Sequence, residues 1–265
     1  MELSLILVLK IAVTMIAVVG LSLIAEHLST RLAGILAGFP HGIAIVLYFI
    51  GIEQGTEFAA QASIYAIGGL AANVLLAYAY FLLCRSANRG NLVLASIGSV
   101  TAFLCAATIL YQLKIDQFNA TVIAGGTIAV VGLLLRHVDN THITGKTKIR
   151  LVDILLRAVL ATAIVLTITQ MAYLIGPNWS GLLAGFPVVT FPLLLIVHSQ
   201  HGKEPVATIV KNYPFGLTSL IVFTVIVSFA YPVFGMNLGT LIGLACAIIY
   251  LAGLSFLTQK RPANN

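Results

Sequence analysis

The chain has 265 residues, of which 60% are hydrophobic and only 8% are charged, and its formal net charge is +6. Soluble domains carry roughly 25% charged residues, so this composition excludes an ordinary water-soluble protein and predicts that lipid is the solvent. A basic soluble protein would suggest nucleic-acid binding. Here we expect no nucleic-acid partner, because the cations follow the pattern of membrane topology described below.

Nine apolar stretches, taken in chain order, are long enough to be membrane helices, since a span needs about 20 apolar residues. They cover residues 3–25, 32–51, 58–83, 92–112, 118–135, 151–175, 181–198, 206–231 and 238–257. The polar segments between them are too short to hold a soluble domain. The sequence therefore predicts an all-α polytopic membrane protein with about nine transmembrane helices.

The cations between these stretches are unevenly distributed. Of the 14 Lys and Arg residues, the odd-numbered loops, the starts of the sixth and eighth spans and the C-terminus hold all except Lys10 and Lys114. Positive residues are retained on the cytoplasmic side of a membrane. We therefore expect the N-terminus outside and the C-terminus in the cytoplasm.

An internal repeat relates the two halves of the chain. The run from Leu36 to Pro40 (LAGFP) recurs at Leu183–Pro187, an offset of 147 residues. The same offset pairs Gly34 with Gly181, Gly55 with Gly202, Glu57 with Glu204, Gly69 with Gly216, and Lys10 with Arg157. Each repeat holds four spans and one further span separates them, so the second copy is expected to be upside down, as in many secondary transporters.

This repeat predicts the domain organisation. We expect two inverted four-helix repeats at residues 1–113 and 151–265, joined by a linker helix and a basic cytoplasmic loop at 114–150. Sites in such proteins lie near the membrane midplane, at the interface between the repeats. The repeated Gly-Phe-Pro segments should therefore approach one another.

The Gly-Phe-Pro segments are the first candidate site. Proline has no N–H and clashes with the preceding turn, so each segment should kink or open its helix. Broken helices are tolerated at membrane depth where they are buried in protein or line a cavity. The candidate substrate-binding residues are Gly38, Phe39, Pro40, His41, Gly185, Phe186, Pro187 and Thr190. The alternative is a packing kink that binds nothing.

Lys10 and Arg157 are the second candidate site, because each lies about a third of the way into the first span of its half. An intramembrane charge indicates function by default, so we expect both to point toward an anionic solute or lipid headgroup. The alternative is that each extends to the membrane surface. Asp153 is a possible partner for Arg157, whereas Glu53 and Glu57 are interpreted as solvated loop acids.

His41 and Asn73 are the remaining polar candidates inside the spans. The charge of a histidine can change near neutral pH, so proton coupling through His41 is one interpretation. The alternative is a neutral histidine that is hydrogen-bonded within the bundle. Asn73 is a candidate for hydrogen bonding between helices.

Enzyme motifs are absent from the sequence: it has no HExxH, no GxSxG, no Walker A and no dinucleotide fingerprint. Three scattered cysteines form no metal or disulfide pattern. We therefore expect a protein that is not an enzyme and that has neither a cofactor nor a metal.

The first half resembles a known family. It contains Leu9-Lys10, Ala33-Gly34, Phe39-Pro40, Tyr48 and the run Gly51-Ile52-Glu53-Gln54-Gly55-Thr56-Glu57. This pattern resembles the GlpM-type small inner-membrane proteins, which have about four spans. The resemblance implies two fused GlpM-like units in a bacterial inner membrane. The second half keeps Arg157, Phe186-Pro187, Gly202 and Glu204 but has His198 and Gln200 in place of the first Gly and Glu.

These features favour a secondary transporter or facilitator of a small anionic solute or a lipid-linked headgroup, acting through a midplane site between the repeats. The alternative is a non-transporting assembly or scaffold protein. A polar cavity reached by Lys10 and Arg157 would favour transport, and a dry, filled core would favour the scaffold. Membrane lipid is the expected partner, while the solute, the coupling ion and the oligomeric state stay open.

Overall fold

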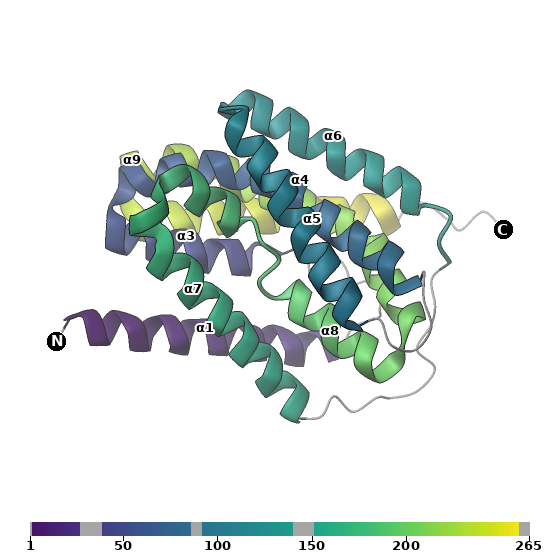
Figure 1. Cartoon of the computed structure of the whole chain (residues 1–265). Coiled ribbons are helices and arrows are strands. Elements are labelled where there is room, and N and C mark those ends of the chain that lie inside the picture. The colour runs from purple at the N-terminus through teal and green to yellow at the C-terminus, as the bar shows by residue number, and fades with distance from the viewer. Residues whose placement is uncertain (1, 27–38, 86–91, 140–150, 260–265) are drawn as a thin grey trace.

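The computed structural model describes residues 2–26, 39–85, 92–139 and 151–259, and its regular elements in these ranges are all α-helices. Figure 1 shows them as one bundle. The helices are α1 (Glu2–Glu26), α3 (His41–Gln54), α4 (Thr56–Arg85), α5 (Leu92–Gln112), α6 (Gln117–Leu135), α7 (Leu151–Ala184), α8 (Thr190–His201) and α9 (Lys203–Gln259). The predicted all-α class is confirmed for this part of the chain.

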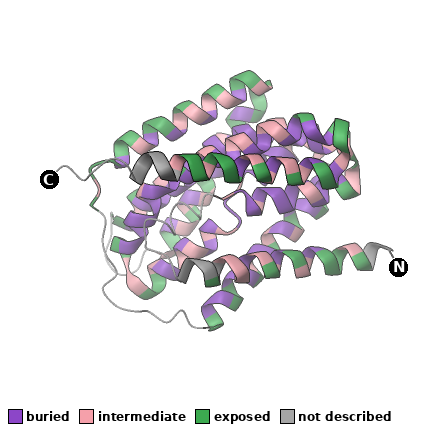
Figure 2. Ribbon diagram, turned by 180° about the vertical axis from the view of Figure 1, so that it is seen from behind, coloured by how far each residue is buried: buried purple, intermediate pink, exposed green. Residues whose placement is uncertain are grey.

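Five of these helices, α4, α5, α6, α7 and α9, are long and apolar enough to cross a membrane. Large apolar side chains cover the outside of the bundle: Ile16, Phe118 and Ile249 are all more than 70% exposed. Figure 2 shows exposed residues on the outer faces of the peripheral helices and buried residues between them. Because an apolar exterior of this kind needs lipid around it, the chain is a membrane protein.

The two longest helices each reverse direction at a glycine. Gly176 in α7 has φ 74° and Gly235 in α9 has φ 73°, which are not helical values. Beyond Gly235 the chain packs back on itself, since the Tyr231 hydroxyl lies 3.2 Å from Thr240 Oγ1. Nine residues of straight helix would separate those positions by about 13 Å along the axis. Helix α9 is therefore a hairpin of two helices.

Helix α4 lies at the centre of the bundle. It packs against α5 and α6 and against both long helices of the second half, α7 and α9. Helices α1 and α6 lie on opposite edges of the bundle (Figure 1). Many of the buried α4 residues are alanine or glycine, for example Ala62, Ala66 and Gly69. Small residues allow membrane helices to approach closely, which explains how one helix accommodates so many neighbours.

Helix boundaries recur at the offset found in the sequence. Helix α3 ends at Gln54 and α8 ends at His201, 147 residues later. The next residues, Gly55 (φ 97°) and Gly202 (φ 80°), have left-handed backbone conformations that are open to glycine without strain. The repeated glycines therefore have the same structural role in both halves, because each one follows the last residue of a short helix.

Candidate functional site

A Phe-Pro pair precedes each of the two short helices, and in the second half it lies in a break between two helices. Helix α3 begins directly after Pro40, whose carbonyl accepts a hydrogen bond from the Ala44 N–H at 2.8 Å. Residues 185–189 separate α7 from α8, and the Pro187 carbonyl accepts from the Phe191 N–H at 2.8 Å. A proline at the start of a helix costs no hydrogen bond. Pro40 thus directly precedes α3, whereas Pro187 lies three residues before Thr190, the first residue of α8, so neither proline lies inside a described helix.

The two Phe-Pro segments, residues 39–42 and 185–190, meet at a small cavity. Its lining comprises Phe39, His41, Gly42, Ile43, Asn73, Ala184, Gly185, Phe186, Pro187, Val188, Val189, Thr190, Tyr213 and Leu220. The two segments therefore contact each other, as their equivalent positions in the repeat predict; Gly38 lies outside the described residues. Counted as the space open to the centres of water-sized molecules, the cavity measures about 20 Å³, which is enough for one ordered water.

Two helix N-termini face this cavity, since its lining includes the first residues of α3, His41 and Gly42, and the first residue of α8, Thr190. Neither helix has a hydrogen bond from an N-cap side chain. The His41 N–H already donates to the Phe39 carbonyl, the Phe191 N–H donates to the Pro187 carbonyl, and Pro192 has no N–H. The helix dipole makes each of these ends positive. The cavity consequently combines two positive helix ends in one place.

A hydrogen-bond network fixes the wall of the cavity. Asn73 Nδ2 donates to the Gly185 carbonyl at 2.7 Å, and the Tyr213 hydroxyl donates to Asn73 Oδ1 at 2.8 Å. The Thr190 side chain is a further hydrogen-bond partner of Tyr213. Asn73 and Tyr213 are almost fully buried, so this network holds α4 and α9 to the interrupted backbone. The prediction that Asn73 bonds between helices is confirmed.

His41 lines the cavity without a hydrogen bond to either ring nitrogen from the described residues. Its side chain is buried, at 9% exposure, and its ring stacks on Phe39 with centroids 6.2 Å apart. The Phe39 carbonyl, the acceptor nearest in sequence, accepts the His41 backbone N–H at 2.8 Å. A buried polar group is normally hydrogen-bonded, and the described residues place no partner within hydrogen-bonding distance of the His41 ring. Both interpretations of His41, proton coupling and a neutral hydrogen-bonded core histidine, stay predictions.

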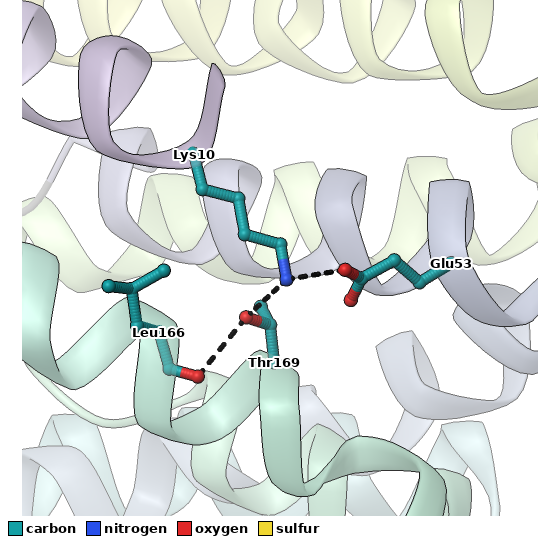
Figure 3. Close-up of polar contacts among 4 residues, drawn as sticks. All are labelled: Lys10, Glu53, Leu166 and Thr169. Atoms are coloured by element: carbon teal, nitrogen blue, oxygen red, sulfur yellow. Dashed lines mark hydrogen bonds and ion pairs between the residues drawn. The ribbon is translucent and has the colours of Figure 1, made fainter. Parts of the chain in front are cut away.

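Lys10 forms a buried ion pair. Its Nζ lies 2.7 Å from Glu53 Oε1 on α3 and donates to Thr169 Oγ1 on α7 at 2.8 Å (Figure 3). Lys10 is fully buried and the Glu53 side chain is 18% exposed. The interpretation of Glu53 as a solvated loop acid is therefore wrong, although Glu57 is exposed. The Lys10–Glu53 ion pair could not be predicted from sequence spacing, because the two residues lie on different helices, α1 and α3.

The second half has an equivalent link with its polar groups rearranged. Arg157 is buried in α7, at 8% exposure, and so is Asp153, one turn before it. Gln200 of α8 occupies the position that Glu53 has in the first half, and its Nε2 donates to Asp153 Oδ1 at 2.6 Å. In both halves, the C-terminal end of the short helix is thus joined to the first helix of that half.

The cavity and the buried cations are separate features. Among the described residues that line the cavity, neither Lys10 nor Arg157 appears. Six of the candidate site residues line the cavity, namely Phe39, His41, Gly185, Phe186, Pro187 and Thr190, and Pro40 is not among the lining residues. Lys10 is linked to the far end of α3 through Glu53, and Arg157 is buried in α7. Tyr213 joins the cavity group without any signal in the sequence, because its contact with Asn73 spans 140 residues. Within the described ranges, no three metal-ligating side chains gather.

Comparisons of the chain with family models, with characterised proteins and with solved structures gave no match. The fold and the site define the class of the protein as a helical membrane protein in which two short helices begin beside one cavity. The resemblance to GlpM-type proteins stays a prediction.

Proposed function

We propose that this protein is a secondary transporter or facilitator of a small anionic solute. The solute binds in the cavity where the Phe-Pro segments 39–42 and 185–190 meet. The observation that carries the proposal is the cavity between the N-termini of α3 and α8. Helix N-termini bind anions through their free N–H groups and their dipoles. Transporters use half-helix N-termini in the same way for anionic groups of their substrates.

An inverted arrangement of the two halves supports this proposal. The reversals at Gly176 and Gly235 would let α7 and α9 each supply two crossings. If the second part of α7 and the short helix α8 together make one crossing, each half has four crossings and α6 lies between the halves. Two halves of opposite orientation would bring α3 and α8 to the cavity from opposite sides of the membrane. The solute would then bind between two bodies that can rock around it, which is the basis of alternating access.

The buried cations have a positioning role in this proposal. Glu53 lies near the C-terminus of α3, where the helix dipole disfavours a negative charge, and the Lys10 ammonium offsets that effect at 2.7 Å. Lys10 also bonds to Thr169 of α7, so the contact joins the first helices of both halves to α3. We propose that Lys10 and Arg157 hold the short helices in place, and that the cavity residues contact the solute.

Anion flux into vesicles tests the proposal. The purified chain is reconstituted in phosphatidylethanolamine and phosphatidylglycerol vesicles, and uptake of chloride, nitrate and formate is measured against protein-free vesicles. We expect saturable uptake that is strongly reduced in Thr190→Val, because Thr190 lines the cavity. Thr218→Val is the matched control, since Thr218 is half-buried outside the cavity lining and donates to the Phe215 carbonyl in its own helix. A stable protein that neither binds nor moves any of these anions would support the scaffold alternative.

A further inference from the structure

We infer that His41 takes up a proton when a small monovalent anion enters the cavity, so that the site binds a proton and an anion together. The inference rests on the proposed function and specifies the substrate class of the same site. It starts from the one cavity-lining side chain whose polar atoms have no hydrogen-bond partner among the described residues.

The position of His41 makes it a ligand for a bound group. It is the first residue of α3, it is buried, it lines the cavity, and both of its ring nitrogens are without a hydrogen-bond partner among the described residues. Leaving a buried polar atom unsatisfied costs about 1–3 kcal/mol. An occupant of the cavity that accepts a hydrogen bond from the ring would remove that cost.

Charge balance indicates what the occupant brings with it. Two helix N-termini attract an anion, but burying a single uncompensated charge within a membrane is costly. A neutral imidazole has one donor and one acceptor nitrogen, whereas a protonated imidazole has two donors. When a proton binds to the free nitrogen of His41 and an anion X⁻ enters, the site gains no net charge. No bond within the anion forms or breaks in this step.

Among the described residues that line the cavity, His41 is the side chain best placed to accept the proton. The described residues that line the cavity include one other titratable side chain, Tyr213 of α9, and its hydroxyl is already bonded to Asn73. Helix α4 contributes the neutral Asn73, and the α7–α8 segment contributes Thr190 and apolar residues. Glu53, with its partner Lys10, lies twelve residues along α3, which is about 18 Å of helix.

The size of the cavity limits the anion. Space for at least one water molecule admits chloride after small side-chain movements, and nitrate or formate, with four and three non-hydrogen atoms, after somewhat larger ones. A single histidine balances a single negative charge, so the site favours monovalent anions. Large organic anions would fit only if the Phe-Pro segments 39–42 and 185–190 moved apart.

Isothermal titration calorimetry with sodium nitrate and sodium chloride tests the inference on the full chain in detergent. Titrations in two buffers with different ionisation enthalpies give the number of protons taken up per anion bound. We expect about one proton per anion. Over the pH range in which the free protein holds His41 neutral and the complex holds it protonated, the apparent Kd should rise roughly tenfold per pH unit.

His41→Gln provides the decisive variant, because glutamine retains a donor and an acceptor but cannot take up a proton. Its anion binding should be weaker and independent of pH, while His137→Gln, at an exposed histidine beyond α6, should behave as the wild type. If His41→Gln does not fold, the proton count of the wild type decides alone. Anion binding without proton uptake, or unchanged uptake in His41→Gln, would overturn this inference and leave the proposed site standing. Absence of anion binding at every pH would overturn the proposed function itself.

Discussion

Gly69 of α4 and Gly185, at the second helix interruption, pack backbone against backbone. A methyl group built on Gly185 would lie 2.6 Å from the carbonyl carbon of Gly69, and one built on Gly69 would lie 2.5 Å from the Leu182 carbonyl oxygen. Two glycines are therefore needed for α4 to reach the interrupted backbone, and this approach also places Asn73 within reach of the Gly185 carbonyl.

Gly185→Ala should destabilise the protein by about 1–3 kcal/mol, because the added methyl group has backbone on its far side and cannot be accommodated by a side-chain movement. The measurement is thermal unfolding in detergent. Gly125→Ala is the matched control, since nothing lies within 4 Å of the added methyl group in α6 and alanine is the better helix former. Equal stability of the two variants would contradict the close approach.

The Lys10–Glu53 pair predicts a strong asymmetry between single and double variants. Lys10→Met leaves a largely buried carboxylate without its cation, which should cost about 3 kcal/mol or more. The double variant Lys10→Met/Glu53→Met removes both charges and should recover most of that loss, because well-packed apolar residues can replace a buried ion pair. Thermal unfolding of the wild type, both single variants and the double variant gives the coupling energy. Additive effects would show that the two side chains do not interact.

Tyr213→Phe tests the network in the wall of the cavity. The change leaves Asn73 Oδ1 buried without its donor, so we expect a loss of about 1–3 kcal/mol in stability and weaker anion binding. Tyr48→Phe removes a hydroxyl that donates to Asn237 at 2.7 Å at an exposed position, where water replaces the lost bond. A loss of similar size in both variants would argue against a special role for the buried network.

Much of the fold could be predicted from the sequence, because hydrophobic run length fixes the helices in lipid. The stretch 92–112 matches α5, and 118–135 differs from α6 by one residue. The break in the helix at Pro187 could also be predicted from the sequence, because the effects of proline and glycine on the backbone are local. The reversals at Gly176 and Gly235 fell between predicted spans, where polar residues and glycine mark the turns.

The contacts of the site were harder to predict. Local spacing suggested Asp153 for Arg157 and offered no acid for Lys10, yet the partner Glu53 lies 43 residues away on a separate helix. Such pairs depend on how helices pack, which a single sequence does not encode in its spacing. The repeat offset was the one long-range signal, and it located equivalent residues such as Glu53 and Gln200. It did not show that the first is the acid of an ion pair, whereas the second is an amide that donates to an acid.

Opposite orientation of the halves predicts opposite labelling of two equivalent positions. Glu57 and Glu204 follow the equivalent glycines at the ends of α3 and α8, and both are exposed. In a background with Cys84, Cys105 and Cys246 replaced, Glu57→Cys should react with a membrane-impermeant maleimide added outside intact cells. Glu204→Cys should react only after the membrane is permeabilised. Labelling of both from one side would contradict the inverted arrangement.

The central place of α4 has a consequence for biosynthesis. The most apolar stretch of α4 is 72% buried, against 22% for α5 and 28% for α6, and much of its cover comes from α7 and α9. Because the chain is made from its N-terminus, α4 enters the membrane before either of those helices exists. Its glycine and alanine face is therefore in contact with lipid or with an insertase until the second half has been synthesised and inserted. We therefore expect chains that stop between 140 and 150 to be degraded rapidly, and to be rescued when the second half is supplied as a separate polypeptide.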